Sequence, residues 1–546
     1  MKIVIIGGVA GGMSAATRLR RLNEDAEIVV FERSGHVSFA NCGLPYHVGG
    51  VIEERRDLLL QTPASLGRRF GIDVRVNHEV TAIDRAAHQV QVTDLMSGQA
   101  SVMDYDVLVL SPGGRPVRPP IPGLDRALSL RDVEGTDALV AATQGAQSAA
   151  VIGAGFIGIE MTENLTRRGL QVTLIEATDQ VMAPLDPEMA GIVHDSIRNA
   201  GVNLILGESV TSVEPTTVTL TNGEQVPADL VVAAIGVRPE VRLALDADLV
   251  VGERGGITVD DHLRTNDPAI YAIGDVVEKI DGLDGSAGLV PLANTANRQG
   301  RVVADIISGR AGADRPVLGT AIVEIFGLAV AATGWNEKRL RAAGRAYRAI
   351  HTHPGSHAGY YPGAATMSLK LLVDPESDAI LGAQAVGHDG VDKRIDIIAT
   401  AITGRITASA LADLELAYAP QFGSAKDPVN MLGYVNRNMA EGLIDTLQWD
   451  ELADAQATGA ALIDVRTTAE FDRGTIPGAI NVPLDDLRAR MADVPAGDLV
   501  VTCQVGLRGY LATRILNQLG RPARNLDGGY RTWLHSPASA DLVVTR

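Results

Sequence analysis

The chain has 546 residues, of which 46% are hydrophobic and 21% are charged, and its formal net charge is −18. A single hydrophobic core stops growing at roughly 250–300 residues, so this length predicts several domains. The 58 glycines and the low aromatic content of 4% are typical of an α/β protein with many tight turns. The acidic balance disfavours nucleic acid and anionic membranes as partners.

The start of the chain and its cysteine content indicate where the protein works. Met1 leads directly into an apolar strand over 3–6 without a cleavage site, so we expect no signal peptide. No apolar run approaches the roughly 18 residues that a membrane-spanning helix needs. Two cysteines are too few for a disulfide framework, and unpaired thiols fit a reducing compartment. These features predict a cytoplasmic protein.

The first 32 residues predict a strand, turn, helix and strand that bind a dinucleotide. The strand over 3–6 precedes a glycine-rich turn, and a second strand over 27–31 ends at Glu32. Glycines allow a pyrophosphate to approach closely, the helix N-terminus favours its charge, and Glu32 can accept hydrogen bonds from ribose hydroxyls. Val9 stands where a second glycine is expected, so the motif is imperfect. The turn consists of Gly7, Gly8, Val9, Ala10, Gly11 and Gly12.

A second motif of the same kind follows the strand over 149–152 and is complete. Its turn over 153–158 has the pattern G-x-G-x-x-G, and the next strand ends at Glu176. Since Glu176 would repel a 2′-phosphate, we expect NADH to be favoured over NADPH. Arg167 and Arg168 lie nearby and moderate this preference.

Two further segments resemble parts of two-dinucleotide flavoproteins. The segment over 265–275 is predicted as a strand that ends in Gly274 and Asp275, and a Ser-Pro-Gly-Gly turn over 111–114 follows the strand 105–110. Together with the two glycine-rich turns, they resemble the pyridine nucleotide–disulfide oxidoreductases over roughly residues 1–445. The resemblance implies FAD and NAD(P)H as cofactors, with Asp275 binding the ribityl chain of FAD. The implied cofactor-binding residues are Gly7, Gly8, Ala10, Gly11, Gly12, Glu32, Arg33, Asn41, Ser111, Pro112, Gly113, Gly274, Asp275, Gly153, Gly155, Phe156, Ile157, Gly158, Glu176 and Gly236.

The first cysteine, Cys42, lies in the segment Ser-Phe-Ala-Asn-Cys-Gly-Leu-Pro-Tyr over 38–46. Most members of the family use two cysteines spaced C-x4-C, whereas this segment resembles the single-cysteine branch of coenzyme A-disulfide reductases, CoA-persulfide reductases, NADH oxidases and NADH peroxidases. In that branch, electrons pass from NADH through FAD to a mixed disulfide, persulfide or sulfenic acid at the cysteine. Because the thiolate is the competent form, we expect positive charge or helix amides to lower the pKa of Cys42. Ala10 stands where the oxidases and peroxidases carry a histidine, which favours the CoA reductases.

The resemblance also implies a coenzyme A site, on the first predicted helix, beside Cys42 and in the C-terminal half. CoA carries a diphosphate and a 3′-phosphate, so an arginine-rich helix on an acidic protein is informative. The alternative is a solvated basic helix face. Arg298 stands where relatives carry a histidine. The implied residues are Ser14, Arg18, Arg21, Ser38, Asn41, Arg298 and Lys426.

Residues from about 320 to 440 resemble the family's dimerisation domain, which completes the partner subunit's active site in relatives. The His-Glu pair of disulfide reductases such as glutathione reductase is not found there. Tyr360, Tyr361 and Tyr418 resemble tyrosines that approach the reactive sulfur from the other subunit, where a phenol can donate a hydrogen bond to a leaving thiolate. Alternatively they pack a dimer interface, and which of Tyr360 and Tyr361 points inward stays open.

From about residue 447 the chain resembles a rhodanese domain. An apolar strand over 498–502 runs into Cys503, and Arg508 lies five residues further on. A loop of backbone amides between a strand and a helix can stabilise a thiolate or a persulfide, and Arg508 adds positive charge or holds the loop. Thr475 stands where a histidine is usual. Cys503 is therefore expected to carry sulfane sulfur, the alternative being a non-catalytic domain.

The predicted fold class is α/β, with two dinucleotide-binding domains, an α+β dimerisation domain and an α/β rhodanese domain. The expected limits are 1–112 with 246–319 for the FAD domain, 113–245 for the NAD domain, 320–444 for the dimerisation domain and 445–546 for the rhodanese domain. The connection near 440–450 has few Gly or Pro residues, so free swinging of the rhodanese is not obvious. We expect a homodimer with shared active sites and no metal centre.

The leading hypothesis is an FAD-dependent NAD(P)H reductase of CoA persulfide, polysulfide and CoA disulfide that releases sulfide or CoA thiol. Its predicted catalytic residues are Cys42, Cys503, Tyr361, Tyr360, Tyr418 and Arg508. Coenzyme A would be a substrate or a bound carrier, its pantetheine arm moving sulfur between the sites. One alternative is an NADH oxidase or peroxidase with a Cys42 sulfenic acid. Another is mainly a sulfurtransferase with a regulatory flavin domain.

Overall fold

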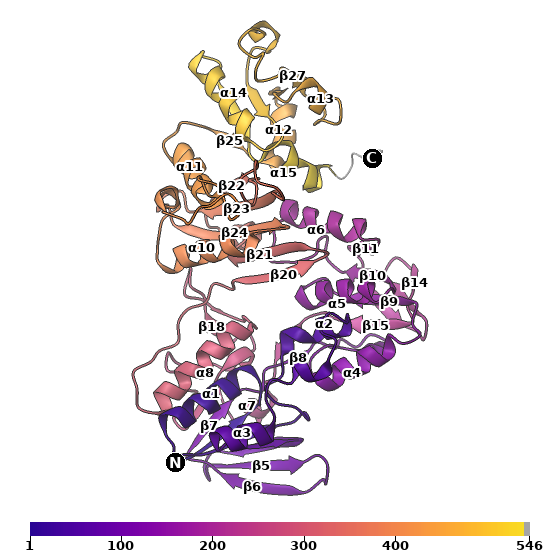
Figure 1. Cartoon of the computed structure of the whole chain (residues 1–546), viewed down its shortest axis with the longest axis vertical. Coiled ribbons are helices and arrows are strands. Elements are labelled where there is room, and N and C mark those ends of the chain that lie inside the picture. The colour runs from indigo at the N-terminus through magenta and orange to yellow at the C-terminus, as the bar shows by residue number, and fades with distance from the viewer. Residues whose placement is uncertain (540–546) are drawn as a thin grey trace. The chain divides into compact units, whose positions relative to one another are not determined.

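The computed structural model describes residues 1–539 and groups the chain into two units, each with its own core. One unit consists of Met1–Asp179 with Val202–Gly319, and the other of Gln180–Gly201 with the chain from Thr320 onward. Figure 1 labels the elements and colours them by residue number. No helix within residues 1–539 is long and apolar enough to cross a membrane.

The first unit begins with a parallel five-stranded sheet in the order β17-β7-β1-β2-β3. Ile3, Val4 and Ile5 of its central strand are fully buried, as expected for a parallel sheet that is covered on both faces. β17 comes last in the sequence yet pairs with β7, so the chain leaves this sheet and returns to it. The strands are β1 (Lys2–Ile6), β2 (Glu27–Glu32), β3 (Asp73–Val76), β7 (Val107–Leu110) and β17 (Ile270–Ala272).

Two helices, α1 (Ala10–Leu22) and α8 (Ala293–Ile307), pack against each other and against this sheet. Met13 and Leu19 of α1 and Val303 of α8 enter the same buried cluster as Ile3. This packing brings residues from the two ends of the first unit onto one helical pair.

A second parallel sheet in the same unit has the order β11-β10-β9-β15. Helix α5 (Phe156–Arg167) crosses from β9 to β10, as the complete glycine-rich motif predicts. The strands are β9 (Ser148–Ile152), β10 (Gln171–Glu176), β11 (Asn203–Leu206) and β15 (Leu230–Ala233). Smaller antiparallel elements are β4 (His78–Asp84), β5 (Gln89–Asp94) and β6 (Ala100–Asp104), then β12 (Val210–Val213), β13 (Thr217–Leu220) and β14 (Gln225–Pro227), and the pair β8 (Gly114–Pro116) with β16 (Val237–Pro239).

The second unit contains an antiparallel five-stranded sheet in the order β20-β21-β24-β23-β22. Helix α6 (Pro187–Asn199) lies in the range expected for the NAD domain, yet it belongs to this unit and contacts β21 and β24 (Figure 1, magenta). The strands are β20 (Ala321–Ile325), β21 (Leu328–Gly334), β22 (Arg348–Thr352), β23 (Met367–Val373) and β24 (Ile380–Gly387), with helices α9 (Glu337–Ala342), α10 (Val391–Thr403) and α11 (Pro428–Ala440).

The C-terminal part of the second unit is a parallel sheet in the order β25-β29-β28-β26-β27. All residues of β28 are buried, and this strand runs into the loop that contains Cys503. The strands are β25 (Thr446–Leu447), β26 (Ala461–Asp464), β27 (Ile480–Asn481), β28 (Leu499–Thr502) and β29 (Ala523–Leu526), and the helices are α12 (Leu452–Ala457), α13 (Thr468–Phe471), α14 (Leu507–Gln518) and α15 (Gly529–His535).

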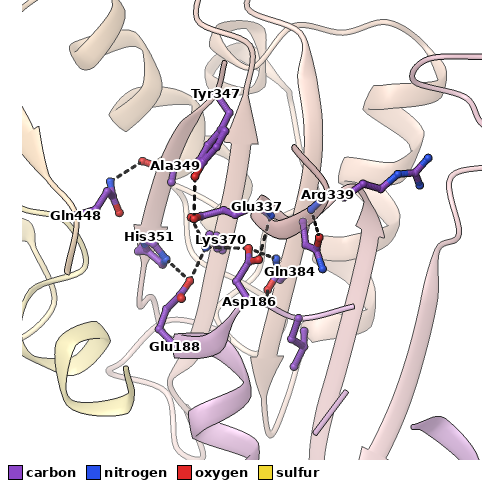
Figure 2. Close-up of polar contacts among 12 residues, drawn as sticks. Asp186, Glu188, Glu337, Arg339, Tyr347, Ala349, His351, Lys370, Gln384 and Gln448 are labelled. Carbon is purple, nitrogen blue, oxygen red and sulfur yellow. Dashed lines mark hydrogen bonds and ion pairs between the residues drawn. The ribbon is translucent and has the colours of Figure 1, made fainter. Parts of the chain in front are cut away.

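A buried lysine joins α6, α9 and β23. Lys370 is fully buried, and its Nζ lies 2.9 Å from Asp186 Oδ2 and 2.6 Å from Glu337 Oε1, with Glu188 also bonded to it (Figure 2). Burial disfavours the charge of Lys370, but the charges of Glu188, Asp186 and Glu337 outweigh this effect and raise its pKa. We call these four residues the Lys370 cluster.

Replacing Lys370 with methionine should strongly destabilise the second unit. Three buried carboxylates would lose their counter-charge, and breaking a buried ion pair costs about 3–5 kcal/mol. Chemical unfolding, read out by hydrogen exchange in α6, measures the effect. Lys393→Met is the control, because Asp427 keeps its contact with Arg394. Equal stability of the two variants would contradict the role of the cluster.

Candidate functional site

The first glycine-rich turn leaves the N-terminus of α1 open to a ligand. Gly7 has φ +101°, and a Cβ on Gly12 would collide with the Gly7 carbonyl oxygen. The N-cap residue Val9 makes no side-chain hydrogen bond to the helix, so the amides of the first turn are available to an anion. Glu32 Oε2 accepts a hydrogen bond of 2.8 Å from Gly8 N. The predicted dinucleotide turn is present in its expected form.

A cavity of about 410 Å³ adjoins this turn. Residues from both halves of the first unit surround it, which suits the adenosine end of a dinucleotide. Among its lining residues are Gly7, Glu32, Arg33, Pro112, Arg131 and Glu240.

Asp275, three residues after β17, has a buried carboxylate oxygen without a partner. Its Oδ1 makes no hydrogen bond within residues 1–539, and burial raises the pKa of this carboxyl while Lys279 opposes the rise. An unpaired buried carboxylate oxygen is costly, and the hydroxyl of a bound ribityl chain is a suitable donor. Gly274 and the side chain of Gln299 hold the turn through a hydrogen bond of 2.8 Å. These residues therefore fit FAD.

The second glycine-rich turn is built like the first. Gly153 has φ +97°, and α5 begins after Gly155, which provides no side-chain cap. Glu176 Oε2 accepts a hydrogen bond of 2.7 Å from Ala154 N. The turn residues Phe156, Ile157 and Gly158 start the helix, and Gly236, with φ +106°, follows β15.

The two arginines expected to moderate nucleotide preference are held by other partners. Arg167 binds Glu163 at 3.2 Å, and Arg168 Nε donates to the carbonyl of Val48 at 2.6 Å. Glu176 is therefore the charged residue that is hydrogen-bonded to this turn.

Cys42 is an exposed, free thiol on the short helical turn Asn41–Gly43, just before α2 (Leu44–Val48). Its pKa is raised by burial and then by the charges of Glu160 and Asp275. The prediction that positive charge or helix amides lower the pKa of Cys42 is therefore wrong for the protein chain by itself. The nearby charged groups are acidic and oppose the thiolate.

Glu160 is a residue of this site that the sequence reasoning missed. It lies on α5, and the hydroxyl of Tyr46 donates to its Oε1 at 3.1 Å across 114 residues of sequence. Burial raises the pKa of Glu160, with Tyr46 opposing the rise. In the sequence, Glu160 is one more glutamate on a helix, so only the fold could bring it to Cys42.

Three of the predicted CoA-binding residues on α1 and α8 each have a polar partner. Ser14 Oγ donates to Asn297 at 2.6 Å, Arg18 binds Asp305 at 2.7 Å, and Arg298 lies 3.8 Å from Asp314. Of the two predicted arginines on α1, Arg18 is thus neutralised and Arg21 is exposed.

The other predicted CoA residues lie elsewhere. Ser38 has φ +47° and precedes Cys42 together with the exposed Asn41, whereas Lys426 is exposed in the second unit. Ser111 and Gly113 follow β7 and approach the first glycine-rich turn through Ser111.

The predicted tyrosines are exposed in the second unit. The exposed fractions of Tyr360, Tyr361 and Tyr418 are 76%, 44% and 47%. The hydroxyls of Tyr360 and Tyr418 lie 2.8 Å apart, and this hydrogen bond raises the pKa of Tyr418. Tyr361 instead packs edge-on against His357. Tyr360 is thus paired with Tyr418, and Tyr361 is held separately.

Cys503 is fully buried at the end of β28. Gly506 N donates to its Sγ at 3.2 Å, which provides one amide of the predicted cradle. Arg508 binds Glu470 through two hydrogen bonds of 2.7 Å, which raise the pKa of Arg508 and lower the pKa of Glu470 to about 2. These bonds join α14 to α13, and Glu470 neutralises the charge of Arg508. Thr475 donates to Asp464 at 3.0 Å.

The fold is that of a two-dinucleotide redox protein with an added domain. It has two glycine-rich turns on parallel sheets, an exposed thiol, and a second α/β region with its own thiol. Family models match the same parts of the chain: pyridine nucleotide-disulphide oxidoreductase over residues 1–300, the dimerisation domain of that family over 320–428, and a rhodanese-like domain over 448–536. The chain belongs to the pyridine nucleotide–disulphide oxidoreductase family and is an oxidoreductase. Membership implies FAD and a pyridine nucleotide.

Similar proteins agree with this assignment. Coenzyme A disulfide reductase of Staphylococcus haemolyticus is 36% identical over 441 residues, which cover 80% of this chain and 100% of that protein. The reduced Bacillus anthracis CoADR-RHD is 46% identical, with a TM-score of 0.96 and 98% of each chain covered. A NAD-dependent persulfide reductase from A. fulgidus is 37% identical, with a TM-score of 0.93, and covers 98% of this chain and 100% of its own. The last two extend over the rhodanese region as well.

Replacing Asp275 with alanine should weaken FAD binding by about tenfold to a hundredfold, since a hydrogen bond to a charged acceptor contributes about 1.5–3 kcal/mol. Flavin content after purification and FAD titration of the apoprotein measure the effect. Asp284→Ala, at an exposed loop position, is the control. FAD binding as tight as in the parent protein would argue against this role of Asp275.

Proposed function

We propose that the chain reduces coenzyme A persulfide or polysulfide, and coenzyme A disulfide, with electrons from NADH. The exposed thiol of Cys42, one helical turn before α2 and near Asp275, is the observation that carries the proposal. The likeness to a CoA disulfide reductase and, over nearly the whole chain, to a persulfide reductase supports it. A fused rhodanese region favours sulfane sulfur over simple CoA disulfide, since a disulfide needs no sulfur carrier.

The reaction balances as CoA–S–SH + NADH + H⁺ giving CoA–SH + H₂S + NAD⁺. Bound FAD would relay the electron pair from the nicotinamide to sulfur. The Cys42 thiolate attacks one sulfur of the substrate and releases the other as a thiolate or hydrosulfide. Glu160, with a raised pKa and a hydrogen bond to Tyr46, can supply a proton to the leaving sulfur.

The coenzyme is proposed to bind on α1 and α8, where Ser14, Arg21 and Arg298 lie on one helical pair and Arg21 is exposed. Ser38 and Asn41 would orient its thiol end beside Cys42. The match to a dimerisation domain supports a homodimer, in which the tyrosines of the second unit and Lys426 would reach the partner subunit's site. The two free thiols favour a cytoplasmic location.

The two alternative functions have less support. An oxidase or peroxidase of this family would carry a histidine where this chain has Ala10. A sulfurtransferase with a merely regulatory flavin domain would not need the second glycine-rich turn, which is intact and opens onto a helix without a side-chain cap.

Nucleotide preference should depend on Glu176. Its carboxylate would repel the 2′-phosphate of NADPH, so Glu176→Ala should raise the ratio of kcat/KM for NADPH to that for NADH by about tenfold, or about 1.4 kcal/mol. Steady-state kinetics with each nucleotide measure the ratio. Asp179→Ala is the matched control, an exposed acidic residue just beyond β10. An unchanged ratio would remove Glu176 from the choice of nucleotide.

Anaerobic stopped-flow mixing tests the function itself. NADH-reduced enzyme should reoxidise rapidly with CoA persulfide or CoA disulfide, and slowly with peroxide or oxygen. Cys42→Ser should keep flavin reduction by NADH but lose persulfide turnover by about a thousandfold or more, as expected for removal of a nucleophile. Peroxide as the fast oxidant would favour the alternative. Turnover of persulfide by Cys42→Ser at the parent rate would exclude Cys42 from the reaction.

A further inference from the structure

The rhodanese region meets the dimerisation region through a buried ion pair within the second unit. Asp527, directly after β29, accepts two hydrogen bonds from His351 of β22, 2.9 Å from the backbone N and 2.7 Å from Nδ1. The other ring nitrogen of His351 lies 3.0 Å from Glu188 of the Lys370 cluster (Figure 2). The side chains of His351 and Asp527 are 1% and 4% exposed, so both are shielded from water.

His351 is held in its charged form. Burial disfavours the charge, but the hydrogen bonds to Asp527 and Glu188 outweigh it and raise the pKa of His351 to about 9. Both ring nitrogens face carboxylates, and only the imidazolium can donate from both. The charged or titratable groups around this region are Asp527, Glu188, Lys370, His353, Arg531 and His535.

The turn after Asp527 links this ion pair to the Cys503 loop. Gly528 and Gly529 have φ +66° and +63°, a conformation that favours glycine. A Cβ on Gly528 would lie 2.8 Å from His351 Cβ, and a Cβ on Gly529 would collide with the carbonyl oxygen of Cys503. The two glycines therefore lie between the dimerisation region and the reactive loop.

The loop itself is bonded to this turn. Tyr530 N donates to the Cys503 carbonyl at 2.7 Å, and Arg531 N donates to the Gln504 carbonyl at 3.0 Å. Gly506 N donates to Cys503 Sγ from the other side of the loop. A shift of the turn would move the carbonyl of Cys503 and the direction of its thiol.

Other contacts also join the rhodanese region to the dimerisation region, and one of them, Gln448 Nε2, in addition donates to Asp527 Oδ2 at 3.4 Å. Trp449 Nε1 donates to Glu188 at 3.2 Å, Gln448 Nε2 donates to the Ala349 carbonyl at 3.2 Å, and Arg341 binds Asp450 at 3.1 Å. The region is thus held by its surface as well as by its connection, in keeping with a segment near 440–450 that is poor in Gly and Pro.

We propose that His351 is a positioning residue for Cys503: through Asp527 it fixes the Gly528–Gly529 turn, and with it the reactive loop, to the dimerisation region. Cys503 then reacts while the rhodanese region stays in contact with the dimerisation region, and small sulfur carriers diffuse to Cys503. With polysulfide, the Cys503 thiolate attacks a terminal sulfur, the bond to the next sulfur breaks, and the shortened polysulfide leaves with the electron pair. No proton or outside reductant is needed.

The test uses full-length holoenzyme with Cys42→Ser as background, so that Cys503 is the single thiol. Inorganic polysulfide is the probe, and the rate of persulfide formation on Cys503 is followed by quench and mass spectrometry. Asp527→Asn and His351→Gln should lower this rate by about tenfold or more, since small displacements of a reacting group cost that much. Flavin reduction by NADH should stay at the level of the background. Asp450→Asn, at the same junction but away from the turn, should stay within about twofold.

The pH dependence of the rate of persulfide formation distinguishes the effect of the charge on His351 from the effect of its size and shape. The folded-state pKa of His351 is raised, so its contribution is complete below about pH 6.5 and is lost as pH rises through about 9. The advantage of the background protein over His351→Gln should therefore disappear above about pH 9. A rate ratio that is constant between pH 7 and 10 would overturn the proposal. Should the variants not fold, hydrogen exchange of residues 527–531 in the parent protein, corrected for intrinsic base catalysis, must show a step near pH 9; its absence would equally overturn the proposal.

This proposal rests on the part of the proposed function that makes Cys503 a sulfur carrier. A parent protein that forms no persulfide on Cys503 would overturn that carrier role together with the positioning role. Equal rates in the Cys42→Ser background and in its Asp527→Asn and His351→Gln derivatives would overturn the positioning role alone.

Discussion

A fully buried lysine ammonium among three carboxylates holds the second unit together. Lys370 binds Asp186 and Glu188 at the start of α6 and Glu337 at the start of α9, so one charge fixes three elements that are far apart in the sequence. Removing such charges from water is expensive, and the arrangement is stable only because each group is paired. The Asp186 carboxylate also accepts from Gln384 and from the backbone of Glu337.

The same cluster extends toward the sulfur chemistry. Glu188 binds His351, His351 binds Asp527, and the turn after Asp527 supports the loop of Cys503. Charged contacts thus run from Lys370 to Asp527, and backbone hydrogen bonds continue from the following turn to the loop of Cys503. Both ring nitrogens of His351 are bonded to carboxylates. The charge state of His351 and the position of the turn are therefore coupled.

The two thiols differ in what surrounds them. Cys42 is exposed and lies near acidic groups that disfavour its thiolate, whereas Cys503 is buried and accepts a hydrogen bond from an amide. Stabilisation of a Cys42 thiolate therefore does not come from the polypeptide as described. Cys503, in contrast, receives an amide from its own loop, and that loop is supported by the turn that Asp527 and His351 hold.

The sequence by itself determined the parts of this protein that depend on short-range backbone chemistry. Gly7 and Gly153 take positive φ values where the motifs predict tight turns, and the apolar runs before them form buried parallel strands. The loop between β28 and α14 likewise places an amide on Cys503, as predicted. These features are readable because glycine conformation and strand burial are properties of neighbouring residues.

Only the tertiary structure decided which charged residues meet. Lys370 and Glu188 are separated by 182 positions, and His351 and Asp527 by 176, so no local pattern marks them. No local pattern marks Glu160 as a neighbour of Cys42, or Asp275 as a residue with an unpaired buried oxygen. In the sequence each is an ordinary acidic or basic residue. Burial and pairing, which set its charge state and its role, arise only when distant segments pack together.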